Sequence, residues 1–134
     1  MADDATVSEL AAAITACAQM HRFGVSGLSD RYDLKADGPD KEFPEAKATG
    51  CYFIFDADDR LLYIGKASLK STIGRRLSTY FRWGTDDVKL QHSGWSPDKE
   101  PTFVRAVSVA EPYQAASLEE YLIDRLQPSQ NTRK

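Results

Sequence analysis

The chain has 134 residues, of which 42% are hydrophobic and 28% charged, as in one ordinary globular domain that buries a core without disulfides or a structural metal. No apolar run approaches the roughly 18 residues of a membrane span, and the acidic, polar start MADDATVSEL argues against a secretory signal peptide. With only two cysteines and two histidines, and no CxxC pair, the sequence excludes a zinc knuckle and favours a reducing cytoplasm.

The net charge is only −3, but the positive charge is concentrated in one stretch of the chain. Residues 1–49 carry nine acidic and five basic side chains, whereas residues 60–82 carry six basic side chains and no acidic one. The six are Arg60, Lys66, Lys70, Arg75, Arg76 and Arg82. Such a stretch suits a phosphate-bearing partner, although a solvated basic face accounts for the charge equally well.

The first 49 residues predict a helix followed by a long connection. Thr6 and Glu9 have the spacing of a capping box, and apolar residues recur on one helical face as far as Ala18. After His21 the chain is rich in Gly, Asp, Pro and Lys, which is typical of a loop with one short element at most. We expect residues 1–49 to be an extension of a core that begins at residue 50.

The rest of the chain, residues 50–134, predicts the order β-β-α, loop, β-α. The apolar runs CYFIF and LLYIG flank ADDR, which is a strong hairpin signal. The elements that follow are a helix over 72–82, a polar loop over 83–101 with room for one helical turn, a strand over 102–110, and a helix over 115–126 that stops before Gln127-Pro128. The expected fold is α+β, with a small central three-stranded antiparallel sheet flanked by helices in a single compact domain.

The predicted hairpin brings two tyrosines together. An even-length turn at ADDR places Ile54 opposite Tyr63 and Tyr52 opposite Gly65. Because side chains alternate between faces, Tyr52 and Tyr63 then emerge on the same side as diagonal neighbours, and Gly65 leaves space beside Tyr52. An odd-length turn would separate them, and strand tyrosines more commonly pack a core.

Helical spacing distinguishes the members of two neighbouring pairs of charged residues. At about 100° per residue, Arg76 lies at the edge of the apolar stripe of its helix and Arg75 points to solvent. In the last helix Glu119 falls inside the apolar stripe, whereas Glu120 faces water. Burying an unpaired carboxylate is costly, so Glu119 needs a cation or several hydrogen-bond donors. The cation is either an arginine in a structural salt bridge or a divalent metal that keeps several waters, as magnesium prefers.

These residue types in this order resemble the GIY-YIG nuclease family over residues 50–131. GCY and YIG stand for its two triplets, RRLSTYF resembles its arginine helix, and ExxLI followed by QPSQN resembles its terminal signature. Cys51 replaces the usual apolar residue of the first triplet, and several extra residues separate YIGK from Arg76. The first ~45 residues have no counterpart, and no recognition module is expected after Asn131, so sequence specificity stays open.

The resemblance implies an endonuclease that hydrolyses phosphodiester bonds in DNA with one active site and one divalent metal, Mg²⁺ or Mn²⁺. Glu119 would be the metal ligand and Arg76 would stabilise negative charge, while Tyr52 or Tyr63 would take or relay the proton of water. Lys66 would stabilise the phenolate. Supporting roles fall to Gly65, Tyr80 and Asn131, and nucleic-acid contacts to Lys66, Lys70, Arg75 and Arg82.

Two other functions remain open from the sequence. One is a catalytically silent module of the same fold that binds nucleic acid or acts as an accessory, and the other is a structural domain whose tyrosines and glutamate are core residues. For the nuclease we expect weak, salt-sensitive contacts to the DNA backbone and no membrane association. A homodimer or an accessory protein would supply specificity. Repair, restriction and mobile-element roles, and DNA versus RNA, stay undecided.

Overall fold

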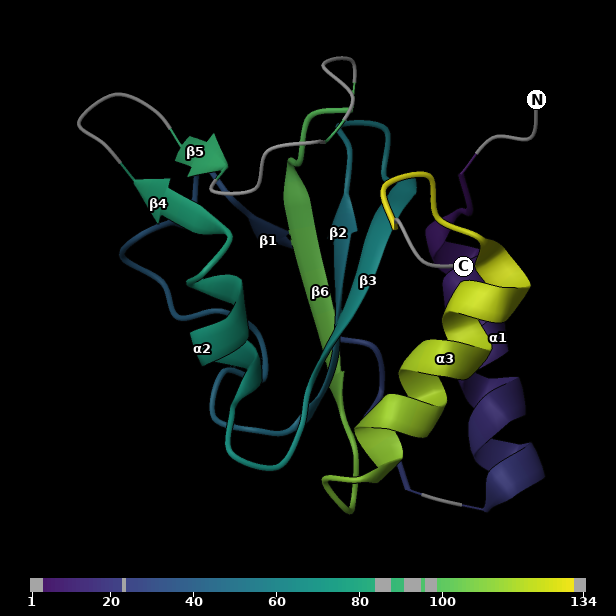
Figure 1. Ribbon diagram of the computed structural model, residues 1–134. Coiled ribbons are helices and arrows are strands. Elements are labelled where there is room, and N and C mark those ends of the chain that lie inside the picture. The colour runs from purple at the N-terminus through teal and green to yellow at the C-terminus, as the bar shows by residue number, and fades with distance from the viewer. Residues whose placement is uncertain (1–3, 23, 84–87, 91–94, 96–98, 132–134) are drawn as a thin grey trace.

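The computed structural model describes residues 4–22, 24–83, 88–90, 95 and 99–131 (Figure 1). The elements in chain order are α1 (Val7–His21), β1 (Tyr32–Asp33), β2 (Gly50–Phe55), β3 (Leu61–Ala67), α2 (Ile73–Leu77), β4 (Phe81–Trp83), β5 (Val88–Leu90), β6 (Phe103–Ser108) and α3 (Gln114–Leu126). Across these described segments, none of the helices combines the length and apolar character that a bilayer crossing requires.

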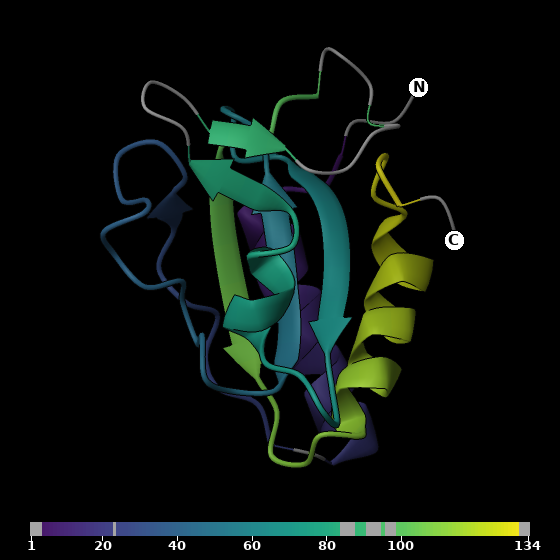
Figure 2. The same cartoon turned by 60° about the vertical axis from the view of Figure 1, so that its left-hand side comes forward.

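A four-stranded antiparallel sheet in the order β1-β6-β2-β3 forms the centre of the fold. Helices α1 and α3 cover one face, and α2 with the β4–β5 hairpin lies over the other (Figures 1 and 2). The predicted α+β class with an antiparallel sheet between helices is confirmed. The sheet has four strands instead of three, because the two-residue β1 within the long connection pairs with β6.

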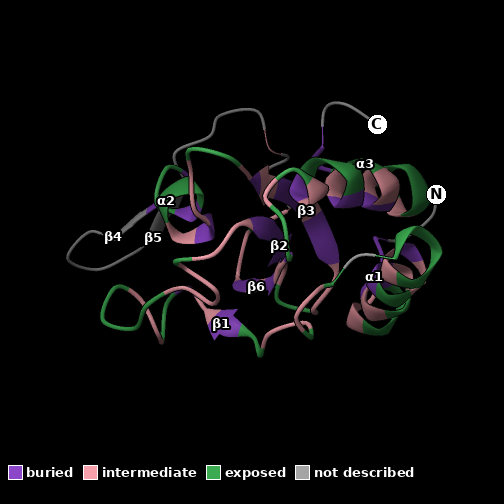
Figure 3. Cartoon of the chain, turned by 90° about the horizontal axis from the view of Figure 1, so that it is seen from below, coloured by how far each residue is buried: buried purple, intermediate pink, exposed green. Residues whose placement is uncertain are grey.

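Each face of the sheet has its own core. Strand β2 is central, so all six of its residues are buried, and its side chains alternate between the two faces. Cys51, Phe53 and Phe55 pack with α1 and α3, whereas Tyr52 and Ile54 pack with α2. Seen from below, the strands and the inward sides of the helices carry the buried residues (Figure 3).

Two of the predicted helices are confirmed at both ends. Helix α1 begins after the Thr6–Glu9 capping box, in which each side chain bonds the other residue's backbone N–H. Helix α3 ends at Leu126, where Gln127 adopts a left-handed backbone ahead of the proline.

The helix predicted over residues 72–82 is wrong in its second half. Helix α2 ends at Leu77, and Phe81 already belongs to β4, where it pairs with Leu90 of β5. Pairing with a strand nine residues away overrides the local helical spacing, and no pattern within 72–82 reveals it. No helical turn occurs among the described residues of 83–101, whose remaining positions lie outside the described part.

Candidate active site

The hairpin register places the two motif tyrosines as the sequence predicts. Tyr52 pairs with Gly65 and Ile54 with Tyr63, and the register shifts only beyond Ile54. A Cβ atom on Gly65 would overlap the ring of Tyr52. The glycine is therefore required by the close approach of a buried tyrosine, which is a reason specific to this position.

Gly65→Ala is expected to lower the free energy of unfolding by about 1–3 kcal/mol, because the fully buried Tyr52 ring cannot yield without strain. Chemical denaturation measures this change. Gly27→Ala is the matched control, since a Cβ there meets no atom within 4 Å. Equal stability of the two variants would show that the Tyr52 ring moves aside freely.

Three tyrosine hydroxyls form a chain from the core to the surface. The Tyr52 hydroxyl donates to the Tyr80 hydroxyl at 3.1 Å, and the hydroxyls of Tyr80 and Tyr63 are also 3.1 Å apart. Tyr52 and Tyr80 are 0% and 3% exposed, whereas Tyr63 is half-buried. Tyr80 therefore joins the two motif tyrosines, and Tyr63 is the end of the chain that water reaches.

Burial keeps these hydroxyls protonated at neutral pH. It raises the pKa of Tyr52 and the pKa of Tyr80 to about 12 each, and it raises the pKa of Tyr63 as well. The positive charge of Arg76 opposes the shift at all three. In the free protein the tyrosines are therefore protonated, hydrogen-bonding groups and very weak acids.

The raised pKa of Tyr52 predicts a specific loss of stability in alkali. Its proton is held more tightly in the folded than in the unfolded state, where the pKa is ~10. The contribution of Tyr52 is therefore complete below pH ~10 and falls by about 2–3 kcal/mol as pH rises to ~12. Tyr52→Phe should flatten this decline, measured by urea unfolding at several pH values. Tyr113→Phe is the control at an exposed tyrosine, and an unchanged slope in Tyr52→Phe would contradict the shift.

Helix α2 presents Arg76 to the tyrosines. Thr72 caps the helix by accepting a hydrogen bond from the Arg75 backbone N–H at 3.2 Å. Burial acts to lower the pKa of Arg76, but its interactions with Tyr52, Tyr80 and Tyr63 raise that pKa overall. Both Arg75 and Arg76 are exposed, so Arg76 has a solvent-facing guanidinium close to the hydroxyl chain.

Glu119 lies half-buried on α3, while Glu120 is exposed. Burial raises the pKa of Glu119, and the charges of Lys66 and Arg76 act in the opposite direction. Within the described residues, no side chain forms an ion pair or hydrogen bond with this carboxylate. Its oxygens are hard ligands of the kind that Mg²⁺ and Mn²⁺ prefer, so the residue fits a divalent metal.

Among the described residues, a metal held by Glu119 would have at most one further ligand of the His, Cys, Asp or Glu type. The described part of the chain contains no group of three or more His, Cys, Asp or Glu side chains that could hold a metal ion. Water and substrate oxygens would complete the coordination shell, as is common for magnesium.

Comparison with protein-family models matches residues 48–132 to the UvrC-like GIY-YIG domain. The chain belongs to this family. The match covers more than half of the chain and includes every residue of the predicted site. The comparison with curated proteins found no match. Family members are nuclease domains, which supports a nuclease-type function for this GIY-YIG domain.

Lys66 of the GIY-YIG domain is placed differently from the sequence-based expectation. It pairs with Cys51, so its side chain emerges on the face that α3 covers, and its charge acts on Glu119. Tyr63 points to the opposite face, because residues three apart in a strand alternate. Among the described residues, the cation that opposes the rise in the pKa of Tyr63 is Arg76.

Asn131 fastens the C-terminal segment of the domain to β3. Its Oδ1 accepts from the Ile64 N–H and its Nδ2 donates to the Ile64 carbonyl, each at 3.0 Å. The Gln130 N–H donates to the Leu62 carbonyl at 3.0 Å. These bonds satisfy the free edge of β3 on either side of Tyr63, which protects the edge and fixes the strand.

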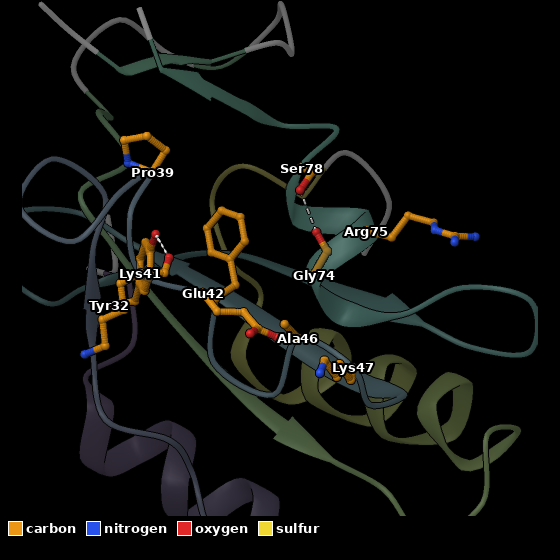
Figure 4. A pocket seen from close by; sticks show the side chains of 10 residues that line it. Tyr32, Pro39, Lys41, Glu42, Ala46, Lys47, Gly74, Arg75 and Ser78 are labelled. Carbon is orange, nitrogen blue, oxygen red and sulfur yellow. Dashed lines mark hydrogen bonds between the residues drawn. The ribbon is translucent and has the colours of Figure 1, made fainter.

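The remaining predicted nucleic-acid contacts are only partly described. Lys70 and Arg75 are exposed, and the side chain of Arg82 lies outside the described part. Arg75 stands at a hollow of about 380 Å³ between α2 and the segment 39–47, and Figure 4 shows its side chain pointing away from that hollow. Lys41, Glu42 and Lys47 also line the hollow, which therefore carries both signs of charge.

Trp95 is not among the residues that the sequence predicts for the site. Its ring lies 5.6 Å from that of Tyr63 with a 36° tilt, and it packs against the core on the α2 side of the sheet. Residue 95 falls in a polar stretch without periodicity, so only its tryptophan identity could have drawn attention to it.

Proposed function

We propose that this GIY-YIG domain is a metal-dependent endonuclease that hydrolyses phosphodiester bonds in DNA, with one active site per chain. One observation carries the proposal. The charges of Arg76 and Lys66 act on the half-buried carboxylate of Glu119, which has no hydrogen bond or ion pair within the described residues, and Arg76 also acts on the tyrosine hydroxyl chain. A carboxylate that can bind a metal, an arginine that can bind phosphate and a hydroxyl that water can reach together suit phosphoryl transfer to water.

Glu119 would hold Mg²⁺ or Mn²⁺ through its carboxylate. When bound, such an ion supplies Lewis-acid stabilisation of the charge on the phosphate and the leaving group. Arg76 would donate hydrogen bonds from its guanidinium to the phosphate oxygens, where negative charge grows in the transition state. Lys66 would add a second positive charge from the α3 side.

Tyr63 is the tyrosine best placed to contact the attacking water, since Tyr52 is fully buried. Either hydroxyl of the Tyr63–Tyr80 pair can be the donor, and when Tyr63 donates, its oxygen can accept a hydrogen bond from water and orient it. Tyr63 can take a proton from water only after it has lost its own. A lower pKa of Tyr63 would make this phenolate available at neutral pH, and Arg76 is a cation that acts in that direction.

A silent nucleic-acid-binding module is the second candidate, and the raised pKa values of the tyrosines favour it, because a tyrosine that keeps its proton at neutral pH cannot act as a general base. A time course with supercoiled plasmid and Mg²⁺ or Mn²⁺ separates the two functions. A nuclease with one site per chain is expected to accumulate open circles before linear DNA. Intact plasmid with every metal, together with retained DNA binding, would favour the silent module.

We propose DNA as the partner, held through its backbone with weak intrinsic affinity. If the four predicted contacts Lys66, Lys70, Arg75 and Arg82 each neutralise one phosphate, binding should weaken roughly 100-fold from about 50 to about 200 mM salt. Filter binding or fluorescence anisotropy checks this, and Arg75→Ala should reduce the salt slope by about one unit. Tight binding that salt leaves unchanged would contradict the proposal, and a homodimer or an accessory protein would supply sequence specificity.

We infer that residues 1–49 belong to the same folding unit as the GIY-YIG core, because Leu10, Ile14 and Cys17 pack in one cluster with Phe53. The buried, free thiols of Cys17 and Cys51 accord with a reducing cytoplasm, which we propose as the location.

A further inference from the structure

Four aromatic rings form an array that leads from the core to the surface at the candidate site. The ring of Tyr80 lies 5.8 Å from that of Tyr52 and 5.7 Å from that of Tyr63, and the ring of Trp95 lies 5.6 Å from that of Tyr63. Tyr52 and Tyr80 are buried, whereas Tyr63 and Trp95 are both partly exposed. Trp95 is therefore the outer end of the array.

We propose that Trp95 is a stacking platform for a nucleobase next to the scissile phosphate, so that the preferred substrate is DNA with an unpaired or unstacked nucleotide at the cut. This inference rests on the nuclease function proposed above. Every base has a π-face, and stacking on an aromatic side chain holds it without reading its sequence. A base that is already unpaired avoids the cost of leaving the duplex stack.

Trp95 lies where one bound nucleotide could place its base on the tryptophan and its phosphate at the candidate active site. Its ring contacts Tyr63, whose hydroxyl ends the hydrogen-bonded chain, and the charge of Arg76 acts on that same tyrosine. A base on Trp95 would thus place its sugar-phosphate beside Tyr63 and Arg76. Trp95 packs on the core but is only partly buried, so it keeps exposed surface that a base could contact.

The chain has only two tryptophans, Trp83 and Trp95, so intrinsic fluorescence can report on each one separately. In the Trp83→Phe variant, titration with a short single-stranded oligonucleotide without metal is expected to quench the emission of Trp95. The Trp95→Phe variant, which keeps Trp83, is the matched control and should respond weakly. Quenching confined to Trp83 would overturn the inference.

Cleavage provides the second readout. Wild type is expected to cut a duplex with an unpaired nucleotide faster than a perfect duplex, and Trp95→Leu should bind the unpaired substrate roughly 5- to 150-fold more weakly. Trp95→Phe keeps a π-face and should retain most of the affinity, whereas leucine keeps only apolar cover for Tyr63. Equal affinity in the leucine and phenylalanine variants would reduce Trp95 to a packing residue.

The two proposals fail in different ways. If metal-dependent nicking occurs but Trp95→Leu changes neither affinity nor substrate preference, the stacking platform is wrong and the nuclease stands. If wild type cuts neither substrate with any metal, the nuclease is wrong. A fluorescence response of Trp95 would then still establish base binding.

Discussion

Glu119→Ala is expected to lower metal-dependent cleavage by about three orders of magnitude or more. Lewis-acid stabilisation at a phosphate is worth several kcal/mol, and each ~1.4 kcal/mol is a factor of ten in rate. Single-turnover cleavage of a labelled DNA at saturating protein measures the loss. Glu120→Ala is the matched control, since it removes the same charge from the next position of α3, where the side chain is exposed.

Loss of activity in Glu119→Ala should not come from unfolding. Burial raises the pKa of Glu119, so its charged form costs free energy in the folded protein, and alanine removes that cost. The variant is expected to unfold at the same temperature as wild type or above it. A large fall in stability, or cleavage that survives the substitution, would contradict the proposed role of Glu119 as a metal ligand.

Arg76→Ala is expected to lower the cleavage rate roughly 100- to 1,000-fold, which is the usual effect of removing one donor to transition-state charge. Arg76→Lys should recover only part of the rate, because lysine lacks the planar fork of guanidinium donors. Arg75→Ala is the control, and it should weaken DNA binding while leaving the rate at saturation close to wild type. Equal loss of rate in the two alanine variants would assign Arg76 to binding alone.

Part of the candidate site can be predicted from local sequence patterns, because those residues are positioned by the register of one hairpin or by the face of a helix on which they lie. The turn fixes the register, so Tyr52, Tyr63 and Gly65 can be placed from alternation alone. Helical spacing likewise separates Glu119 from Glu120, because α3 is long and strongly amphipathic. These are short-range consequences of the periods of strand and helix.

Other features depend on contacts between distant segments and could not be predicted. Strand β1 is too short to show an alternating pattern of apolar residues, and it forms because its backbone pairs with the edge of β6. The end of α2 at Leu77 depends on β4 pairing with β5. The contact of Trp95 with Tyr63 joins a patternless stretch to the sheet, and no local rule links residues 32 positions apart.

The expected partnership of Lys66 with Tyr63 is a different kind of error. The alternation that places Tyr52 and Tyr63 on one face also sends Lys66 to the other, so the sequence already contained the contrary indication. Since β3 lies at the edge of the sheet, groups from both faces can meet around it, and the charges of Lys66 and Arg76 both reach Glu119.

We propose that Glu119 and Arg76 belong to one metal-dependent phosphodiesterase site. The most direct test of this proposal is plasmid nicking by wild type, Glu119→Ala and Arg76→Ala, each with Mg²⁺, with Mn²⁺ and with a chelator. We predict nicking by wild type with metal only, and its loss in both variants at unchanged fold. Nicking that persists in the chelator, or in Glu119→Ala with metal, would contradict the site.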